Sequence, residues 1–280
     1  MFKRIYLLCL LATTVFAQEG RLAFSAYDEA AGRHLPYTYD LATGDLREVA
    51  IPAEADCGDL ALIYDGSRVA VELNADGEQL LYVCPTRTGE RAVHREPFPG
   101  AEPSWIEYTT LCYTVDGNLW HWDGVNDPLD WQPDVGRSPV HRDWVNIFYV
   151  RDYPEGGQAV VHVNVNEGVE EAVLSTERVG GRLDDLELSP DGRRLAASWH
   201  ESSGLILILD LDGGGPPVRA VSSSGELRWP SFSPDGEWLA YYDAEAGAVM
   251  AVPVEGGDPV KLYDLGDCRG LDWGPTPEDW

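Results

Sequence analysis

A repeated turn motif limits what this chain can fold into more than any other feature of its sequence. Ser-Pro-Asp-Gly occurs at residues 189–192 and again at 233–236, and a short apolar run follows each copy. Asp-Gly tolerates the positive φ of tight turns, and Pro stops the preceding strand, so each copy predicts a hairpin. The predicted structural turn residues are Asp191, Gly192, Asp235 and Gly236, with a weaker copy at Asp65 and Gly66.

The spacing of the motif predicts the architecture. Asp191 and Asp235 are 44 residues apart. A repeat of this length with several short strands per unit is typical of a β-propeller, in which each repeat forms one blade. The unit resembles the TolB-type β-propeller repeat, whose signature is Ser-Pro-Asp-Gly followed by an apolar strand. The resemblance covers about residues 20–275. It implies an all-β, non-enzymatic scaffold of the bacterial envelope that binds proteins through its loops and channel mouth.

Apolar strands and turns divide the chain into six predicted blades of four antiparallel strands. The predicted blades are residues 21–51, 56–98, 103–132, 140–175, 183–221 and 226–263. Five or seven blades are the alternatives, because the third and fourth repeats are degenerate. Blade 1 lacks its first strand, and residues 269–275 resemble the first strand at 228–234. We therefore predict that this tail pairs with residues 21–27 and closes the ring, which removes two bare strand edges.

The first residues predict export. Lys3 and Arg4 precede an uncharged run at residues 5–15, and small residues stand at Val15 and Ala17. This pattern predicts a secretory signal peptide over residues 1–17 that is cleaved after Ala17. The apolar run is too short to span a bilayer. We expect residues 18–280 to form a single, monomeric propeller domain, periplasmic or secreted, with no membrane span.

The net charge of the chain limits the kinds of partner that it can bind. The formal net charge is −28, from 48 acidic and 20 basic residues. Such a surface argues against nucleic acid and anionic lipid as partners, and it permits a basic protein or peptide. Charge for solubility, or adaptation to salt, is the alternative explanation.

Four cysteines follow the predicted leader: Cys57, Cys84, Cys112 and Cys268. In an exported chain they predict disulfides, and the sequence leaves three pairings open. The repeat places Cys57 and Cys268 at equivalent positions of neighbouring blades. This favours a Cys57–Cys268 bond across the ring closure and leaves Cys84–Cys112 as the second pair.

No strong catalytic motif is present. The chain has no Gly-x-Ser-x-Gly elbow, no His-Glu-x-x-His and no phosphate loop, and its histidines are not at zinc spacing. We predict no catalytic residue and expect no cofactor, although acidic loops also suit Ca²⁺.

The loops between second and third strands are predicted to share one face with the blade-to-blade connections. Together with the ends of strands near the channel mouth, they supply the candidate binding residues, which are Asp28, Glu72, Asp76, Asp116, His141, Arg142, Asp152, Trp199, His200, Glu201, Asp243 and Glu245. Polar residues are also typical of any wet surface loop.

Three functions fit these observations. The leading hypothesis is an exported propeller that binds a protein or peptide. The second is a metal-dependent lyase or lactonase with its site at the channel mouth. The third is a small-ligand or glycan binder that uses Trp105, Trp144 or Trp199. Histidines and carboxylates converging at the channel mouth favour the enzyme, and a mixed acidic and aromatic rim favours binding.

Overall fold

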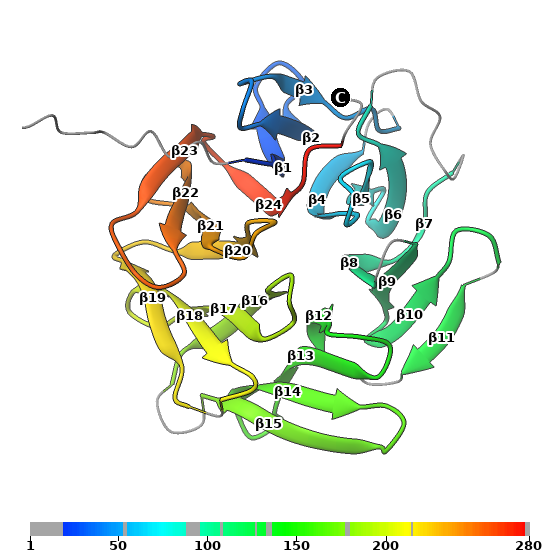
Figure 1. Cartoon of the computed structure of the whole chain (residues 1–280). Coiled ribbons are helices and arrows are strands. Elements are labelled where there is room, and N and C mark those ends of the chain that lie inside the picture. The colour runs from blue at the N-terminus through cyan, green and yellow to red at the C-terminus, as the bar shows by residue number, and fades with distance from the viewer. Residues whose placement is uncertain are drawn as a thin grey trace, which may run out of the picture.

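The chain forms a ring of six blades around a central channel (Figure 1). The structure is a computed structural model that describes residues 19–52, 55–87, 96–106, 109–126, 128–132, 136–176, 180–213 and 215–277. Each blade is a four-stranded antiparallel sheet, and the described residues contain no helix. The all-β fold and the predicted number of blades are confirmed. Within the described ranges, therefore, no apolar helix of membrane-spanning length occurs.

The strands of blades 1 to 3 run in chain order from the inside outward, except that the last strand of the chain is the inner strand of blade 1. Blade 1 contains β24 (Cys268–Gly274), β1 (Arg21–Asp28), β2 (Arg33–Asp40) and β3 (Leu46–Glu48). Blade 2 contains β4 (Asp56–Leu62), β5 (Arg68–Ala75), β6 (Glu78–Pro85) and β7 (Phe98–Pro99). Blade 3 contains β8 (Ala101–Ile106), β9 (Thr110–Val115), β10 (Asn118–Trp122) and β11 (Leu129–Gln132).

Blades 4 to 6 follow the same order. Blade 4 contains β12 (Arg137–His141), β13 (Asn146–Asp152), β14 (Gln158–Asn164) and β15 (Val169–Ser175). Blade 5 contains β16 (Arg182–Leu188), β17 (Arg194–His200), β18 (Gly204–Asp210) and β19 (Val218–Ser223). Blade 6 contains β20 (Leu227–Phe232), β21 (Trp238–Asp243), β22 (Ala248–Pro253) and β23 (Val260–Asp264).

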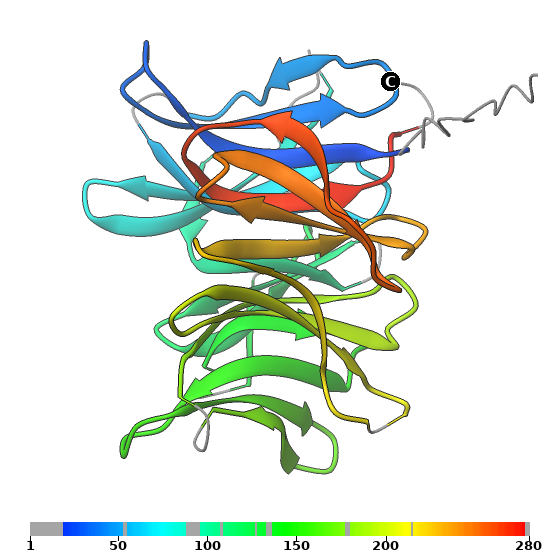
Figure 2. The ribbon, with the colours of Figure 1, turned by 90° about the vertical axis from the view of Figure 1, so that its left-hand side faces the viewer.

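The ring has two faces, between which the strands run (Figure 2). The turns between first and second strands lie on one face, which we call the turn side. The loops between second and third strands lie on the opposite face with the blade-to-blade connections, and we call it the loop side. This arrangement agrees with the predicted grouping of the loops.

The two ends of the chain close the ring. Strand β24 pairs antiparallel with β1, in a register that runs from Arg21 opposite Gly274 to Ala26 opposite Cys268. The closing strand and the first strand lie side by side in Figure 1. The predicted closure is therefore confirmed, and it leaves the inner strands of all six blades around the channel.

Polar contacts fix the closing strand to its neighbours. The His34 side chain is 2% exposed, and its Nε2 lies 3.1 Å from Asp267 Oδ2, next to the start of β24. The backbone N–H of His34 donates to Asp56 Oδ1 over 2.8 Å. Asp56 in turn pairs with Arg269 on β24. These contacts join blades 1 and 2 at the seam where the chain begins and ends.

The repeated turns have the role that their sequence predicts. In the last copy, Ser233 Oγ donates to Asp235 Oδ1 over 2.5 Å, and the N–H of Glu237 donates to the same oxygen over 2.9 Å. Gly236 has φ +71°, in the left-handed region that favours glycine. Asp191 and Gly192 repeat this geometry in blade 5.

The core lies mainly between adjacent blades. In one cluster, Leu22 and Phe24 of blade 1 pack with Tyr242 and Val249 of blade 6. In another, Ile106 and Cys112 of blade 3 pack with residues of blade 4. Since each sheet is covered by its neighbours on both sides, apolar residues fill both of its faces near the channel.

The predicted disulfides are absent, because Cys57, Cys84, Cys112 and Cys268 are buried free thiols. The inferred equivalence of Cys57 and Cys268 is correct, but Cys57 packs in the cluster of Val71 and Cys268 packs in the cluster of Leu22. Burial raises the pKa of the Cys57 and Cys268 thiols to about 12. The four cysteines therefore act as small apolar residues of the core.

Two predictions fall on parts of the chain that the structure leaves out. The signal peptide at residues 1–17 lies outside the described residues. So does the fourth strand of blade 2 predicted at residues 91–95, and the fourth strand that the structure describes is β7.

The contact between the closing segment and blade 2 is testable with a pair of equivalent glycines. Gly66 and Gly236 have φ +69° and +71°, but a Cβ on Gly66 would lie 2.2 Å from the Pro275 carbonyl oxygen, whereas the nearest atom to one on Gly236 is 3.7 Å away. We expect Gly236→Ala to lower the free energy of unfolding by about 1 kcal/mol, and Gly66→Ala to lower it by at least about 2 kcal/mol more. Urea unfolding measures the free energy of unfolding of both variants. Equal decreases in the two variants would contradict the contact between Gly66 and the Pro275 carbonyl.

The free thiols are testable with Ellman's reagent on the oxidised, unreduced protein. We expect Cys57, Cys84, Cys112 and Cys268 to be unreactive in the native protein, because they are buried. In denaturant without reductant, all four should react. Each disulfide would remove two reactive thiols from that number, so a lower count would restore the original prediction.

Candidate functional site

The first strand of every blade contains a β-bulge that faces the channel. In β4, Cys57 lies opposite Leu73, but Leu60 lies opposite Val71, so one extra residue is inserted. The same shift occurs in β8, β12, β16, β20 and β24. A bulge breaks the ladder locally and redirects side chains. The ring of bulges therefore brings polar side chains to the middle of the channel.

Proline marks three of these bulges. Glu102, Ser138 and Trp229 have φ values of 50°, 53° and 49°, and a proline follows each of them. Proline cannot donate a ladder hydrogen bond and is tolerated in a sheet at edges and bulges. The inner edge of a propeller blade offers both conditions.

The channel widens into a cavity at each end. The turn-side chamber has a volume of about 430 Å³, and the loop-side basin has a volume of about 950 Å³. The residues that line both cavities, and so form the waist of the channel, are Asp59, Glu102, Ser138, Asp185 and Trp229. All of them belong to the bulges.

Three carboxylates form the acidic floor of the loop-side basin: Asp59, Glu72 and Glu102. Glu72 accepts hydrogen bonds of 3.3 Å from Gln79 Nε2 and from the backbone N–H of Glu102. Thr114 Oγ1 donates to Glu102 over 3.2 Å. None of the three carboxylates makes an ion pair with a described residue.

Burial and mutual repulsion perturb this floor. Burial raises the pKa of Glu102 to about 7, and the neighbouring Glu72 charge acts in the same direction. Burial also holds the pKa of Asp59 well above its usual range, with added repulsion from Glu72 and Asp185. Strongly perturbed carboxyl groups in a cleft are typical of functional sites.

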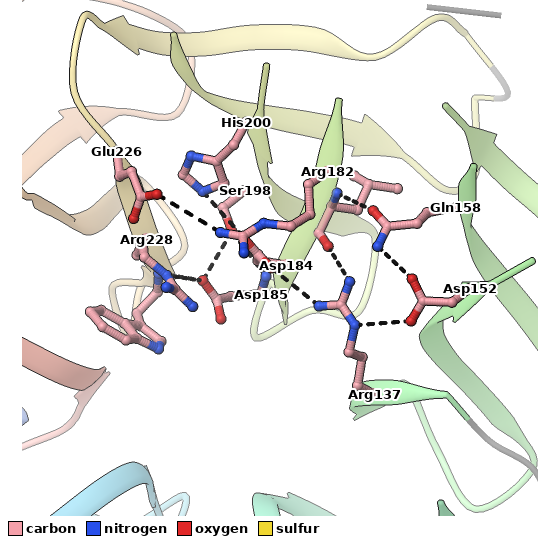
Figure 3. Close-up of polar contacts among 12 residues, drawn as sticks. Arg137, Asp152, Gln158, Arg182, Asp184, Asp185, Ser198, His200, Glu226 and Arg228 are labelled. Carbon is pink, nitrogen blue, oxygen red and sulfur yellow. Dashed lines mark hydrogen bonds and ion pairs between the residues drawn. The ribbon is translucent and has the colours of Figure 1, made fainter. Parts of the chain in front are cut away.

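A polar network borders the basin across blades 4 to 6 (Figure 3). Arg137 donates to Asp184 Oδ1 over 3.2 Å, to the Leu183 carbonyl over 2.7 Å and to Asp152 Oδ2 over 3.3 Å. Arg182 pairs with the other Asp184 oxygen at 2.8 Å. Asp184 is thus held between two guanidinium groups, and these arginines are already neutralised.

Asp185 anchors the second half of this network. Its carboxylate accepts hydrogen bonds from Ser198 Oγ at 3.0 Å and from the backbone N–H of Trp229 at 3.1 Å. Arg228 Nε lies 3.5 Å from the same carboxylate. Burial disfavours the Arg228 charge, but Asp185 and Asp184 outweigh it and raise the pKa of Arg228. This part of the basin is therefore rigid and close to neutral.

The predicted binding residues fall into three groups. Glu72 and Asp116 line the loop-side basin, and Asp152 and His200 join its network. His141 and Arg142 line the turn-side chamber, on the opposite face. The remainder lie on or beside loop-side loops and do not line either cavity: Asp28, Asp76, Trp199, Glu201, Asp243 and Glu245.

Several of these loop residues stabilise their own turns. Asp28 accepts from the N–H of Ala31 over 2.7 Å, and Asp243 accepts from the N–H of Glu245 over 2.9 Å. Asp76 has φ 52°, a turn conformation that Asp tolerates. A local structural role accounts for them.

Five carboxylates of the first strands line the turn-side chamber but were not among the predicted binding residues: Asp59, Glu102, Asp185, Glu187 and Asp272. Each stands inside a short strand next to apolar residues, where a charged side chain is unusual. That position, and proline inside a predicted strand, were the available signals.

The described residues contain no group of three or more His, Cys, Asp or Glu side chains that could hold a metal ion. The three tryptophans considered for ligand binding are also separated. Trp105 lines the turn-side chamber, Trp144 is an exposed residue of the β12–β13 turn, and Trp199 lies at the loop-side end of β17.

No family model and no curated protein sequence matches the chain. Among solved structures, it is similar to TolB from Acinetobacter baumannii, with a TM-score of 0.74 and 18% identity over 93% of this chain and 68% of that chain. It is also similar to a chain of a nidogen/laminin complex, with a TM-score of 0.67 and 12% identity over 91% and 98% of the two chains. For Kuenenia stuttgartiensis hydrazine synthase the TM-score is 0.56, with 15% identity over 80% and 72%. These likenesses support the propeller fold and carry no function.

Because the pKa of Glu102 is raised in the folded protein, we expect that replacing this carboxyl group stabilises the protein at high pH. The folded protein keeps the Glu102 proton up to about pH 7, while the unfolded chain releases it near the ordinary glutamate pKa of 4.5. The native protein therefore loses stability as the pH rises through this window. We expect Glu102→Gln to raise the free energy of unfolding by roughly 1–3 kcal/mol at pH 8 and by much less at pH 5.

Urea unfolding of both proteins at the two pH values measures this difference. Glu237→Gln, at an exposed turn position, is the matched control and should change little at either pH. A Glu102→Gln variant that is less stable than the native protein at pH 8 would show that the Glu102 charge is stabilised by its surroundings.

Proposed function

We propose that the protein is an exported binding scaffold that holds a basic segment of a protein or peptide partner in the loop-side basin. The observation that carries this proposal is the acidic floor of the basin. Asp59, Glu72 and Glu102 face one cavity, and no described residue forms an ion pair with them. A cationic side chain of a partner would supply the missing counter-charge.

The basin's own cations are already occupied. Arg137 pairs with Asp152 and Asp184, and Arg228 pairs with Asp185. Arg269, at the edge of the basin, pairs with Asp56. The remaining charge of the basin is negative, and so is the net charge of the chain, at −28. The negative charge of the basin and that of the whole chain both attract a basic partner.

The size and rigidity of the basin favour a peptide segment. At about 950 Å³ it accommodates several side chains of an extended segment or loop. The Asp184 and Asp185 networks and the proline-containing bulges fix its walls before a ligand arrives. A preformed site loses less conformational freedom on binding, which increases affinity.

Two fluorescent peptides of ten residues test the proposal, one rich in Lys and Arg and one in which Glu replaces those residues. We expect saturable binding of the basic peptide by fluorescence anisotropy and none of the acidic peptide. The double variant Glu72→Gln/Glu102→Gln should weaken binding about tenfold or more, which is about 1.4 kcal/mol. Added salt should weaken binding by the native protein, because the floor acts through charge.

The matched control is Glu167→Gln/Glu237→Gln, which removes the same charge at two exposed positions on the turn side. It should bind the basic peptide as the native protein does. Equal loss of binding in both double variants would mean that net charge alone attracts the peptide. Full binding by the floor variant would place the peptide elsewhere.

A further inference from the structure

The turn-side chamber has an architecture of its own. One residue from each first strand occupies the same position, paired with an equivalent residue of the second strand. Examples are Glu187 opposite Ala196 and Asp272 opposite Ala23. The six members of this layer are Ala61, Trp105, His141, Glu187, Ser231 and Asp272, and all of them except Ser231 line the chamber.

The two carboxylates of the layer differ in their partners. Asp272 accepts from the backbone N–H of Leu62 over 2.6 Å and from Ser231 Oγ over 2.9 Å. Glu187 has no hydrogen bond and no ion pair with any described residue, although it lies deep in the channel. Burial holds its pKa well above the usual range, and Asp272 and Asp59 add repulsion. An unpartnered carboxyl group in such a place is costly for the fold and typical of a binding site.

Within the described part of the chain, no unpaired cation lines the chamber. Arg142 is the one described Lys or Arg among the lining residues, and its Nη2 pairs with Asp212 Oδ1 at 2.9 Å. His141 stacks on Trp131, with ring centroids 5.8 Å apart, and neither of its ring nitrogens has a hydrogen-bond partner among the described residues. Burial, with repulsion from His121, lowers the pKa of His141 to about 3. The imidazole is therefore neutral and cannot balance Glu187.

Part of the wall around these carboxylates is apolar. Phe232 and Val140 are buried lining residues, and the Trp105 indole N–H donates to the Ala61 carbonyl over 3.0 Å, so its polar atom is satisfied within the protein. The donor set also differs from that of a metal site, because no group of three or more ligating side chains is found in the described residues. A cation with an aliphatic body matches the chamber better than a bare ion does.

We propose that the turn-side chamber binds an alkylammonium group, with its charge against Glu187 and Asp272 and its aliphatic stem against the apolar wall. An ammonium group has three donors and no acceptor, so it can satisfy Glu187 and a free lone pair of Asp272 together. Its stem requires the apolar surroundings that a hydrated metal ion would not use. Both a lysine side chain of a partner and a small free amine have this chemistry.

Isothermal titration calorimetry with two probes distinguishes these sources. The first probe is n-pentylamine, and the second is an end-blocked pentapeptide with one central lysine and no other charge. We expect one-to-one saturable binding of at least one probe. Amine binding alone identifies a small free amine as the source, and peptide binding alone identifies a protein side chain. 1-Pentanol and the N-acetyl-lysine form of the peptide, which lack the charge, should not bind.

Glu187→Gln is the diagnostic variant, because it breaks no hydrogen bond to any part of the chain that the structure describes. It should fold normally, with an unchanged or higher Tm, and bind the probe at least tenfold more weakly. Glu167→Gln/Glu237→Gln removes two charges on the same face outside the chamber and should bind as the native protein does. The loop-side variant Glu72→Gln changes a residue that lines the basin and not the chamber, so it should also retain the probe, and the chamber and the basin are tested separately.

Three results would overturn the proposal. The first is the absence of saturable binding by both probes at millimolar concentration. The second is unchanged affinity in Glu187→Gln. The third is stoichiometric binding of CaCl₂ that Glu187→Gln abolishes and that excludes the amine, which would make the chamber a metal site. None of these results alters the peptide assay at the loop-side basin.

Discussion

The pairing of β24 with β1 is the interaction on which the rest of the structure depends. Every other sheet is built from strands that follow one another in the chain, so those strands find their partners locally. Blade 1 alone needs residues from both ends of the chain, and without β24 the ring would have an open edge. The same strand carries Asp272 and Trp273 into the wall of the chamber. The strand that closes the ring therefore also completes the wall of the channel.

The bulges place polar side chains in the channel of this closed ring and so form the candidate binding site. A regular inner strand would direct its side chains toward the neighbouring blades, where the core is apolar. The extra residue in each first strand breaks that alternation at one level of the channel, and the residues that line both cavities stand there. Proline at residues 103, 139 and 230 fixes the bulges without loss of a needed donor. Carboxylates such as Asp59 and Glu102 can face the channel because the ladder is already interrupted.

The sequence was sufficient for the features that depend on local chemistry. Asp235 and Gly236 specify a turn through a side-chain hydrogen bond and a positive φ, and the recurrence of that turn specifies the blades. Closure followed from the likeness between residues 228–234 and 269–275. The repeat could also show that Cys57 and Cys268 are equivalent. It could not show that their side chains enter different core clusters, because that depends on the distance between blades.

The candidate site was harder to predict for the same reason. Loop residues such as Asp28 and Asp243 look functional in sequence because they are acidic and near glycine, yet their carboxylates bond their own turns. Glu187 and Asp272 look like solvent-facing residues of alternating strands. Their significance appears only when six first strands from distant parts of the chain converge on one axis. His141 and Glu72 were both placed at the channel mouth, but only the three-dimensional ring assigns them to opposite ends.

The two ends of the channel differ in how their buried carboxylates are balanced. In the loop-side basin, Asp184 and Asp185 are balanced by arginines, and the excess charge rests on Asp59, Glu72 and Glu102. In the turn-side chamber, Glu187 has neither an arginine nor a hydrogen-bond partner among the residues that the structure describes. Carboxyl groups that raise one another's pKa remain partly protonated until a cation arrives, because ionising all of them in one channel is unfavourable. A cationic ligand at either end would therefore favour their ionisation, which gives an acidic channel a physical reason to select positively charged partners.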